Sequence, residues 1–297
     1  MPADSIVVAD TATVGLLSRP ITEEMQRQRA RARLRRRRIL VNVLRVLIGV
    51  AIVLVWELTT RAGIVDKFFY GQPSGIYWQI VTWITEGTAQ GPLWRQIVVT
   101  LEETLIGFGI GVFLGVFCGV LLGTNRLLAD IFAPYIKAFN SIPRIVLGAI
   151  FTLAFGLGMT SKVALAVVLV FFVVFFNAFQ GVREVDSNLL ANARILGARR
   201  HRVTAEVIIP SALSWILASL HTAFGFALVG AVVGEFLGST EGIGLLISTA
   251  QNNFNANGVF AAMVILAVVA LIAESIVTAV ENRLIRWRPN AVADVTI

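Results

Sequence analysis

Charged residues are scarce in this chain of 297 residues, since Asp, Glu, Lys and Arg together make up only 14% of it. Soluble globular domains carry about 25% charged residues, so the composition argues against a soluble protein. Short segments of alternating hydrophobicity, which are typical of outer-membrane barrels, are also missing from the sequence. What the chain lacks therefore indicates a helical protein that is embedded in a lipid bilayer.

Cysteine and histidine are nearly absent too. Cys118 is the only cysteine, which excludes a disulfide within the chain, and His201 and His221 are the only histidines. No group of His, Cys and carboxylate residues has the spacing of metal ligands. Neither a Gly-x-x-x-x-Gly-Lys-[Ser/Thr] loop nor a Gly-x-Ser-x-Gly elbow occurs. We therefore expect no catalytic residues, no metal site and no cofactor bound by this chain, and no enzymatic activity of its own.

Long hydrophobic runs are abundant, and hydrophobic residues make up 57% of the chain. About 20 apolar residues are enough to cross a bilayer as a helix. A spanning segment must be helical here, because lipid offers no partners to its backbone groups. The sequence therefore predicts an all-α integral membrane protein with about six transmembrane helices. They cover residues 40–60, 98–123, 133–156, 162–180, 213–237 and 259–282.

The positions of the basic residues predict the orientation of these spans, because Lys and Arg accumulate in cytoplasmic segments. Residues 27–38 are densely basic and precede the first span, and the loop 181–212 carries five arginines. Residues 61–97 and 238–258 carry few basic residues. We therefore expect the N-terminus, this loop and the C-terminal tail to be cytoplasmic. A basic tail could also bind nucleic acid or anionic lipid, but we favour a topology signal and expect no nucleic-acid partner.

The composition divides the chain into four segments. Residues 61–97 contain an amphipathic pattern that fits either a helix in the outer headgroup region or a cap packed on the bundle, and both interpretations remain open. The expected segments are a basic cytoplasmic tail at 1–38, the first span with an outer amphipathic segment at 39–97, the main transmembrane domain at 98–288, and a cytoplasmic tail at 289–297.

The second predicted span has a glycine at every fourth position. This spacing leaves one stripe of the helix without side chains, so that another backbone can approach closely. The sequence does not show whether that backbone belongs to the same chain or to a second copy. The glycines are Gly107, Gly111, Gly115, Gly119 and Gly123.

The third predicted span carries polar residues on one face, although an ionisable group at membrane depth costs roughly 2.5–3.5 kcal/mol. Pro143 interrupts this polar stripe and is expected to kink the helix. The stripe either lines part of a translocation path for an anionic solute, with Asn177 of the next span as a neighbour, or lies near the cytoplasmic surface with Lys137 extended towards water. The stripe consists of Lys137, Asn140, Ser141 and Arg144.

Several glutamates also lie in or at the edges of the predicted spans. Proton coupling is conceivable for such groups, but an interfacial position or a helix-packing hydrogen bond is more common, and we favour it. The glutamates are Glu57, Glu102, Glu103, Glu235 and Glu274.

The most distinctive segment is the loop 185–210 between the fourth and fifth predicted spans. Asp186 or Ser187 can cap a short helix, and Gly197 suits the left-handed residue that ends one. A second amphipathic stretch follows and is expected to stop at Pro210. Two short helices joined at a glycine on the cytoplasmic face predict a docking element for a soluble partner.

The spacing in this loop resembles that of the permease subunits of bacterial ABC importers. Those subunits carry Glu-Ala-Ala, three residues, Gly, nine residues, and then an aliphatic, any residue, an aliphatic and Pro. This chain has Ala191-Asn192-Ala193, three residues, Gly197, nine residues, and then Val207-Ile208-Ile209-Pro210. It departs from the pattern at Ala191 and Asn192, where Glu and Ala are usual, and Ala191 has no carboxylate to form a salt bridge in place of that Glu.

The similarity extends to Val233-Gly234-Glu235-Phe236 and Gly242-Ile243-Gly244, and covers about residues 95–288. It is nearest to the nitrate/sulfonate/taurine branch, which also includes permeases for thiamine and pyrimidine precursors. The substrate stays open between nitrate, an organosulfonate, taurine, an aromatic carboxylate and a vitamin precursor.

The resemblance implies a multi-pass permease subunit in the bacterial inner membrane that forms a translocation path for a small solute. Its implied partners are a second copy of itself, two cytoplasmic ATPase subunits that bind ATP and Mg, an extracytoplasmic solute-binding protein and the lipid bilayer. An ion-coupled secondary transporter or channel without ATPase is the alternative, and a membrane scaffold or sensor is a third class. The residues implied to couple to the ATPase are Leu189, Ala191, Asn192, Ala193, Gly197, Ala198, Arg199 and Pro210.

Overall fold

The protein is helical throughout the part that the structure describes, apart from short connections. The computed structural model covers the backbone of residues 11–284. Side chains are described over residues 34–283, apart from those of Ser187, Arg194, Arg200 and residues 280–282. The chain forms two compact units, one up to Val65 and one from Asp66 onward. The prediction of an all-α protein is confirmed.

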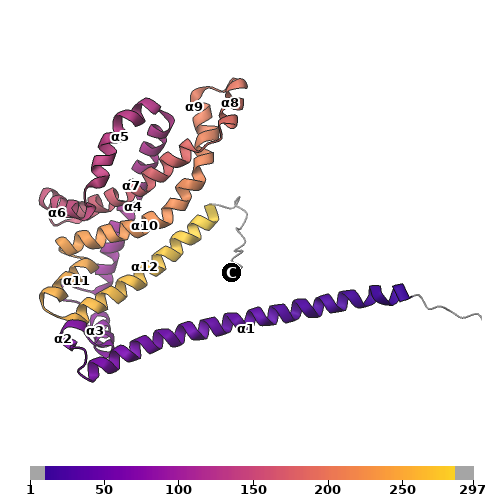
Figure 1. Ribbon diagram of the computed structural model, residues 1–297. Helices are drawn as coiled ribbons and strands as arrows, with labels where there is room; N and C mark the ends of the chain where they lie inside the picture. Colours follow the sequence, from indigo (N-terminus) through magenta and orange to yellow (C-terminus); the bar gives the residue numbers. More distant parts are fainter. Residues whose placement is uncertain (1–10, 285–297) are drawn as a thin grey trace, which may run out of the picture. The chain divides into compact units, whose positions relative to one another are not determined.

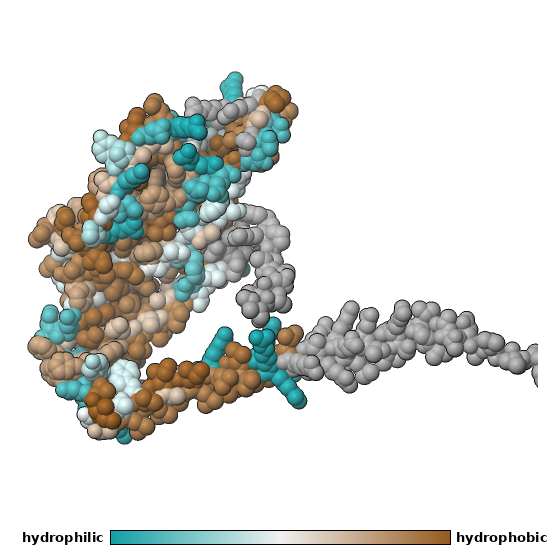
Figure 2. All heavy atoms as spheres, in the orientation of Figure 1, coloured by the Kyte–Doolittle hydropathy of each residue, from teal (hydrophilic) through white to brown (hydrophobic). Residues whose placement is uncertain are grey.

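The first unit is dominated by one long helix, α1 (Thr11–Arg61), which contains 51 residues. Its segment Leu34–Arg61 is long and apolar enough to cross a membrane, and Figure 2 shows hydrophobic residues along this part of α1. The predicted first span at 40–60 therefore lies inside α1. The helix also begins within the segment expected to be a tail, 1–38, because the arginines there are good helix formers.

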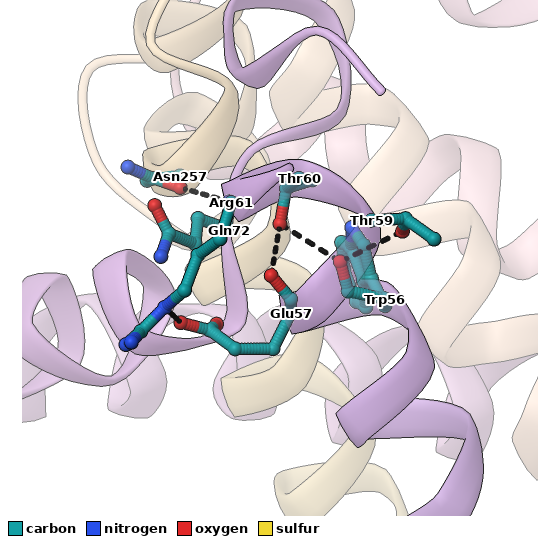
Figure 3. A network of polar contacts seen from close by, with 7 residues as sticks. All are labelled: Trp56, Glu57, Thr59, Thr60, Arg61, Gln72 and Asn257. Atoms are coloured by element: carbon teal, nitrogen blue, oxygen red, sulfur yellow. Dashed lines mark hydrogen bonds and ion pairs between the residues drawn. The ribbon is translucent and has the colours of Figure 1, made fainter. Parts of the chain in front are cut away.

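Polar side chains near the end of α1 bond to groups of the same helix (Figure 3). The Thr60 hydroxyl donates to the carbonyl oxygens of Trp56 and Glu57 at 2.8 and 3.0 Å, and the Thr59 hydroxyl donates to Trp56 O at 3.0 Å. Arg61 Nε pairs with Glu57 Oε1 at 2.6 Å, one turn back. These contacts satisfy the polar groups inside the helix, as a segment at the edge of a bilayer requires.

The second unit is built around three long helices, α4, α7 and α10 (Figure 1). Helix α7 packs against both of the others. The helices of this unit are α2 (Lys67–Tyr70), α3 (Pro73–Thr85), α4 (Leu93–Thr124), α5 (Arg126–Ser141), α6 (Arg144–Phe155), α7 (Met159–Arg183), α8 (Ser187–Ile195), α9 (Arg200–Val203), a π-helical turn (Thr204–Ile208), α10 (Ile209–Leu237), α11 (Ile243–Asn252) and α12 (Ala256–Leu284).

Helix α3 is attached to the start of α12. The Gln72 N–H donates to Asn257 Oδ1 at 2.8 Å (Figure 3), and α3 packs along α12. Tyr77 and Trp78 of α3 stay exposed. The outer segment therefore packs on the bundle and still presents an aromatic surface, so both interpretations of its amphipathic pattern stay open.

Between residues 11 and 284, five helices are long and apolar enough to span a membrane, or six if the bent pair α5 and α6 is one broken span. This agrees with the expected number. On the face shown in Figure 2, hydrophobic residues cover most of the second unit, and hydrophilic residues gather towards the end that carries α8 and α9.

The predicted third span, 133–156, is two helices that meet at 88°. Ile142 lies in the extended region, at φ −73° and ψ 129°, because the ring of a following proline disfavours the helical conformation. Pro143 also lacks the N–H that would continue the helix. The expected kink is therefore confirmed and is a complete break.

The glycine stripe of α4 lies against α7. A Cβ added to any of the four glycines from Gly111 to Gly123 would come within 2.6–2.8 Å of a Cβ on α7, and one on Gly107 would come closer still. The facing residues on α7 also recur at every fourth position, and are Ala166, Val170, Val174, Ala178 and Val182. The backbone that the stripe admits thus belongs to the same chain, which the sequence left open.

Candidate functional site

The predicted docking element contains a defined helix, α8, between α7 and α10. Asp186 caps its start, since Oδ1 accepts a backbone N–H two residues ahead at 2.8 Å. Gly197 follows its end at φ +79°, and the Ala198 N–H donates to Ala193 O at 3.0 Å, which is the six-to-one bond of a Schellman motif. The predicted cap and helix end are confirmed. A side chain at Gly197 would be strained in this conformation, so the glycine determines where α8 stops.

Apolar side chains on and beside α8 are not covered by the part of the chain that the structure describes. Ile195 and Leu196 are 82% and 86% exposed, and Leu189 is 51% exposed. Burying one such side chain contributes about 1.5–3 kcal/mol, so the cluster is suited to contact a partner. Among the other residues singled out in this loop, Ala191, Asn192 and Arg199 are exposed, and Ala193 and Ala198 are half-buried.

The second half of the loop corrects the sequence prediction. Pro210 does not stop a helix, because α9 continues through the π-helical turn into α10, with Pro210 in the first turn of α10. In the π-helical turn the bonding shifts by one residue, so that the Ile209 N–H donates to Thr204 O. The proline then occupies a first-turn position where no N–H is required. One unbroken stretch from His201 to Leu237 results.

The loop is attached to two helices that are packed tightly beside it. A Cβ on Gly181 of α7 would lie 2.8 Å from Trp215 Cβ of α10. A buried apolar cluster fills the same region and consists of Ala178, Val182, Ala212 and Ile216. The two helices that flank the loop in the chain are therefore packed against each other where the loop joins them.

The predicted polar stripe is divided by the break at Pro143. Arg144, at the start of α6, donates from Nη2 to Asn140 Oδ1 at the end of α5, and its guanidinium carbon lies 5.1 Å from the centre of the Phe172 ring. Ser141 and Asn177 each donate to a carbonyl oxygen one turn back in their own helix. The structure thus joins Asn140 and Arg144, and among the described residues no hydrogen bond links Asn177 to that pair.

A buried polar network lies at the opposite end of α4, α7 and α10, and for Glu235 it confirms the helix-packing hydrogen bond that we favoured for glutamates in the spans. Glu235 is fully buried. Its Oε1 accepts from the Thr100 hydroxyl at 2.7 Å, and its Oε2 accepts from the Gly244 N–H at 2.6 Å. The Thr100 oxygen in turn accepts from the Ile243 N–H at 2.9 Å, and Gln96 Oε1 accepts from the backbone just before α11 at 2.7 Å.

This network satisfies the N–H groups at the start of α11, which have no partners within the helix. A carboxylate at a helix N-terminus is also favoured by the helix dipole. The two glycines permit the approach, because a Cβ on Gly242 would collide with the Glu235 carboxyl and one on Gly244 would collide with Val232 O. The network therefore joins α4, α10 and α11 into one packed end.

Two further ionisable side chains are buried beside this network. Lys162 of α7 is fully buried, and its ammonium donates to Leu157 O at 2.6 Å and Gly158 O at 3.2 Å. Glu103 of α4 is 2% exposed, and its Oε2 has no hydrogen-bond partner in the described part of the chain. The glutamates in the predicted spans gave a signal for this site, but the bond between Thr100 and Glu235 joins residues 135 positions apart, which no local pattern reveals.

The family model described as "Binding-protein-dependent transport system inner membrane component" matches residues 111–286 of this chain. This segment begins in the glycine stripe of α4 and includes α8 and the start of α11.

Curated relatives match over most of the chain. The putative aliphatic sulfonates transport permease protein of Bacillus subtilis is 31% identical over 82% of this chain and 86% of its own length. The riboflavin transport system permease protein of Chloroflexus aurantiacus is 33% identical over 72% of this chain and 77% of its own. The taurine transport system permease protein of Escherichia coli is 26% identical over 78% of this chain and 85% of its own.

The fold is also found among solved structures. A chain of the MetNI methionine ABC transporter in an inward-facing conformation matches with a TM-score of 0.56 and 20% identity, and the match covers 65% of this chain and 94% of that one. At this identity the match establishes the shared fold alone.

Proposed function

We propose that α8 couples this chain to a cytoplasmic ATPase. The proposal starts from the family: the chain belongs to the binding-protein-dependent transport system inner membrane components and is a membrane-spanning permease subunit of an ABC importer. The chain is a transport subunit and not an enzyme. The observation that carries the proposal is the uncovered apolar surface at the end of α8, held between two packed spans.

The docking surface combines apolar contact with small residues. Leu189, Ile195 and Leu196 present apolar side chains to the ATPase, and their burial would contribute about 1.5–3 kcal/mol each. Ala191 and Asn192 are exposed on the same helix and allow a close approach. Ala191 carries no charge where the resembling motif has Glu, so here apolar contact takes a larger part in the docking.

ATP and Mg bind to the ATPase subunits, and this chain transmits their movement. When two ATPase subunits close around ATP, each carries its α8 with it. Since α8 is joined to α7 and α10, and α7 lies tightly against α4 through the glycine stripe, the three long helices move as one body. That movement switches the translocation path between access from the cytoplasm and access from the outer side of the membrane.

A second copy of the chain completes the path. Helix α5 has no residue buried by the described part of this chain, and its break from α6 leaves irregular backbone within a predicted span. Such backbone is tolerated at membrane depth only where protein covers it or water fills a cavity beside it. These features support a position at the interface of two copies, beside the path.

The pair of Asn140 and Arg144 lies at this break and supports a path for a small anionic solute. Arg144 would place one positive charge from each copy next to the path. The curated relatives named for aliphatic sulfonates and taurine fit a solute that carries an anionic group. An extracytoplasmic solute-binding protein delivers the solute at the end of the molecule that carries α11.

The basic residues support a cytoplasmic position for the N-terminus and for α8. Arginines cluster before the first apolar run and again in the loop around α8, as expected for cytoplasmic segments. Six crossings, with α5 and α6 counted as one, support the same orientation, because an even number of crossings leaves both ends of a chain on one side.

Gly197→Leu tests the coupling. The substitution strains the left-handed residue by roughly 1–2 kcal/mol and changes the exit of α8, so we expect about tenfold less ATPase subunit to co-purify from native membranes. The amount and the size-exclusion profile of the chain should be unchanged, since nothing lies within 4 Å of a Cβ at this position. Mass spectrometry of the purified complex measures the ratio of ATPase to chain.

Two variants control this experiment. Gly63→Leu carries the same backbone strain, at φ +73° in open space, and should leave ATPase recovery unchanged. Gly197→Asn should restore most of it, because Asn tolerates the left-handed conformation. Equal ATPase recovery from the Gly197→Leu variant would contradict the coupling role of α8, and uptake into liposomes on an ion gradient without any ATPase would favour a secondary transporter.

A further inference from the structure

A cleft of about 390 Å³ opens at the α11 end of the second unit, at the opposite end of α7 from α8. Its walls come from the first turns of α4, the connection between α6 and α7, and the connection between α10 and α11. Three glutamates line it, Glu102, Glu103 and Glu241, against a single basic residue, Arg95. Arg95 is already paired with Glu241 at 2.8 Å, so carboxyl groups remain in excess.

Glu103 distinguishes this cleft from an ordinary acidic surface. Its side chain is 2% exposed and forms part of the wall, and Oε2 has no hydrogen-bond partner among the described residues. Leaving a buried polar atom without a partner costs about 1–3 kcal/mol. The nearest buried cation does not supply the missing bond, because the Lys162 ammonium donates instead to Leu157 O and Gly158 O. A donor that enters the cleft would supply it.

The walls indicate which kind of cation fits. Among the described residues, no group of three or more His, Cys, Asp or Glu side chains is placed to hold a metal ion, which favours an organic cation here. The remaining walls include Trp94, Leu157 and Met159, which are suited to the apolar stem of a long side chain. The Trp94 ring is 65% exposed, and an aromatic face also attracts an organic cation.

We propose that this cleft receives a lysine or arginine side chain from an extracytoplasmic protein that docks on the permease. The stem of that side chain packs on the apolar wall, and its charged end donates to the glutamates, with Glu103 Oε2 as the innermost acceptor. The inference rests on the proposed function, which places the α11 end outside the cytoplasm. It assigns a recognition site to the α11 end, at the opposite end of α7 from the α8 docking surface.

Photo-crosslinking in intact cells tests the proposal with the whole chain and its native partners. Val98 is exposed and lines the cleft, so Val98→p-benzoylphenylalanine places the probe at its wall. We expect a protein adduct whose crosslinked peptide, sequenced by mass spectrometry, comes from an extracytoplasmic protein and contains Lys or Arg. Leu105→p-benzoylphenylalanine, on an exposed position of the same helix outside the cleft, should give no such adduct.

Charge removal then tests the chemistry. Glu102→Gln combined with Glu241→Gln should lower the adduct yield about tenfold, since charge-assisted hydrogen bonds are lost. Glu184→Gln, on an exposed glutamate at the other end of α7, should leave the yield unchanged. No protein adduct, an adduct that survives the double substitution, or an adduct displaced by a free amine solute such as taurine would each overturn the proposal.

Recovery of the ATPase from the same cells distinguishes a failure of the cleft proposal from a failure of the coupling proposed for α8. ATPase recovered without an adduct at the cleft overturns this inference and leaves the coupling function standing. Loss of the ATPase from the unsubstituted chain would overturn the proposed function as well.

Discussion

The two ends of the α4, α7 and α10 bundle are built in opposite ways. At the α11 end, Glu235 and Thr100 bond to backbone N–H groups of α11, and these side chains are fully buried. At the α8 end, Ile195 and Leu196 are almost fully exposed, and a π-helical turn separates the loop from the regular part of α10.

This difference indicates how one set of helices can serve two tasks. The α11 end is completed within the chain, so it fixes how the three helices are arranged. The α8 end leaves apolar side chains exposed, and we propose that a partner covers them. A movement imposed on α8 then acts on helices that are already held together at the far end, and the whole bundle follows instead of deforming locally.

The largest effect is expected from breaking the packing that joins the two ends. Gly119→Leu places a side chain where a Cβ alone would lie 2.7 Å from Ala178 Cβ and 2.9 Å from Phe175 O. Overpacking costs about 1–3 kcal/mol and occasionally more, and here the added side chain would also meet backbone atoms of α7, so we expect little monodisperse protein in size-exclusion chromatography after detergent extraction.

Gly109 offers a matched control on the same helix, because nothing lies within 4 Å of a Cβ at that position. Gly109→Leu should give a normal elution profile. If both variants elute alike, the close packing of α4 on α7 does not hold the bundle together.

A smaller effect is expected at the α11 end alone. Glu235→Gln keeps the shape of the side chain but replaces one of its two acceptor oxygens with an amide NH2. Either the Thr100 hydroxyl or the Gly244 N–H then faces a donor instead of an acceptor. The cost should be about 1–3 kcal/mol, measured as a lower midpoint of thermal unfolding by tryptophan fluorescence.

Glu274→Gln is the control for that substitution. Glu274 pairs with His221 at 2.8 Å, but both side chains are nearly half exposed, and exposed pairs contribute about 0–1 kcal/mol. The unfolding midpoint should hardly move. If Glu274→Gln lowered the unfolding midpoint more than Glu235→Gln, this would contradict the conclusion that the buried network of Glu235 stabilises the α11 end.

The smallest effect is expected at the α8 end, where only a helix cap is removed. Asp186→Ala deletes the side-chain acceptor at the start of α8, which costs about 1 kcal/mol. Amide hydrogen exchange in α8 should accelerate about fivefold without any change in the unfolding midpoint of the bundle. Unchanged exchange in α8 would show that the cap does not stabilise it.

The sequence predicted those features that depend on local spacing. Six apolar runs predicted the spans, Asp186 and Gly197 predicted the limits of α8, and Pro143 predicted a kink where the structure has the break between α5 and α6. Each of these follows from the conformational preference of one residue or from the length of one run.

The features that sequence reasoning missed depend on contacts between distant residues or, at Pro210, on a local change in the helical hydrogen bonding. The glycine stripe predicted a close neighbour, but its partner on α7 is made of ordinary Ala and Val residues with no signal of their own. The stop expected at Pro210 was wrong, because the π-helical turn moves the proline into the first turn of α10. The bonds of Glu235 to Thr100 and Gly244 required the folded arrangement of three helices.

The account is tested most directly by the accessibility of Leu196, the most exposed apolar residue beside α8. Leu196→Cys, made together with Cys118→Ala to remove the only native cysteine, would be labelled with a membrane-impermeant maleimide in inside-out vesicles. We predict slow labelling while the ATPase is bound and rapid labelling after the ATPase is stripped from the vesicles. Equal labelling in both states would contradict the claim that α8 docks on the ATPase.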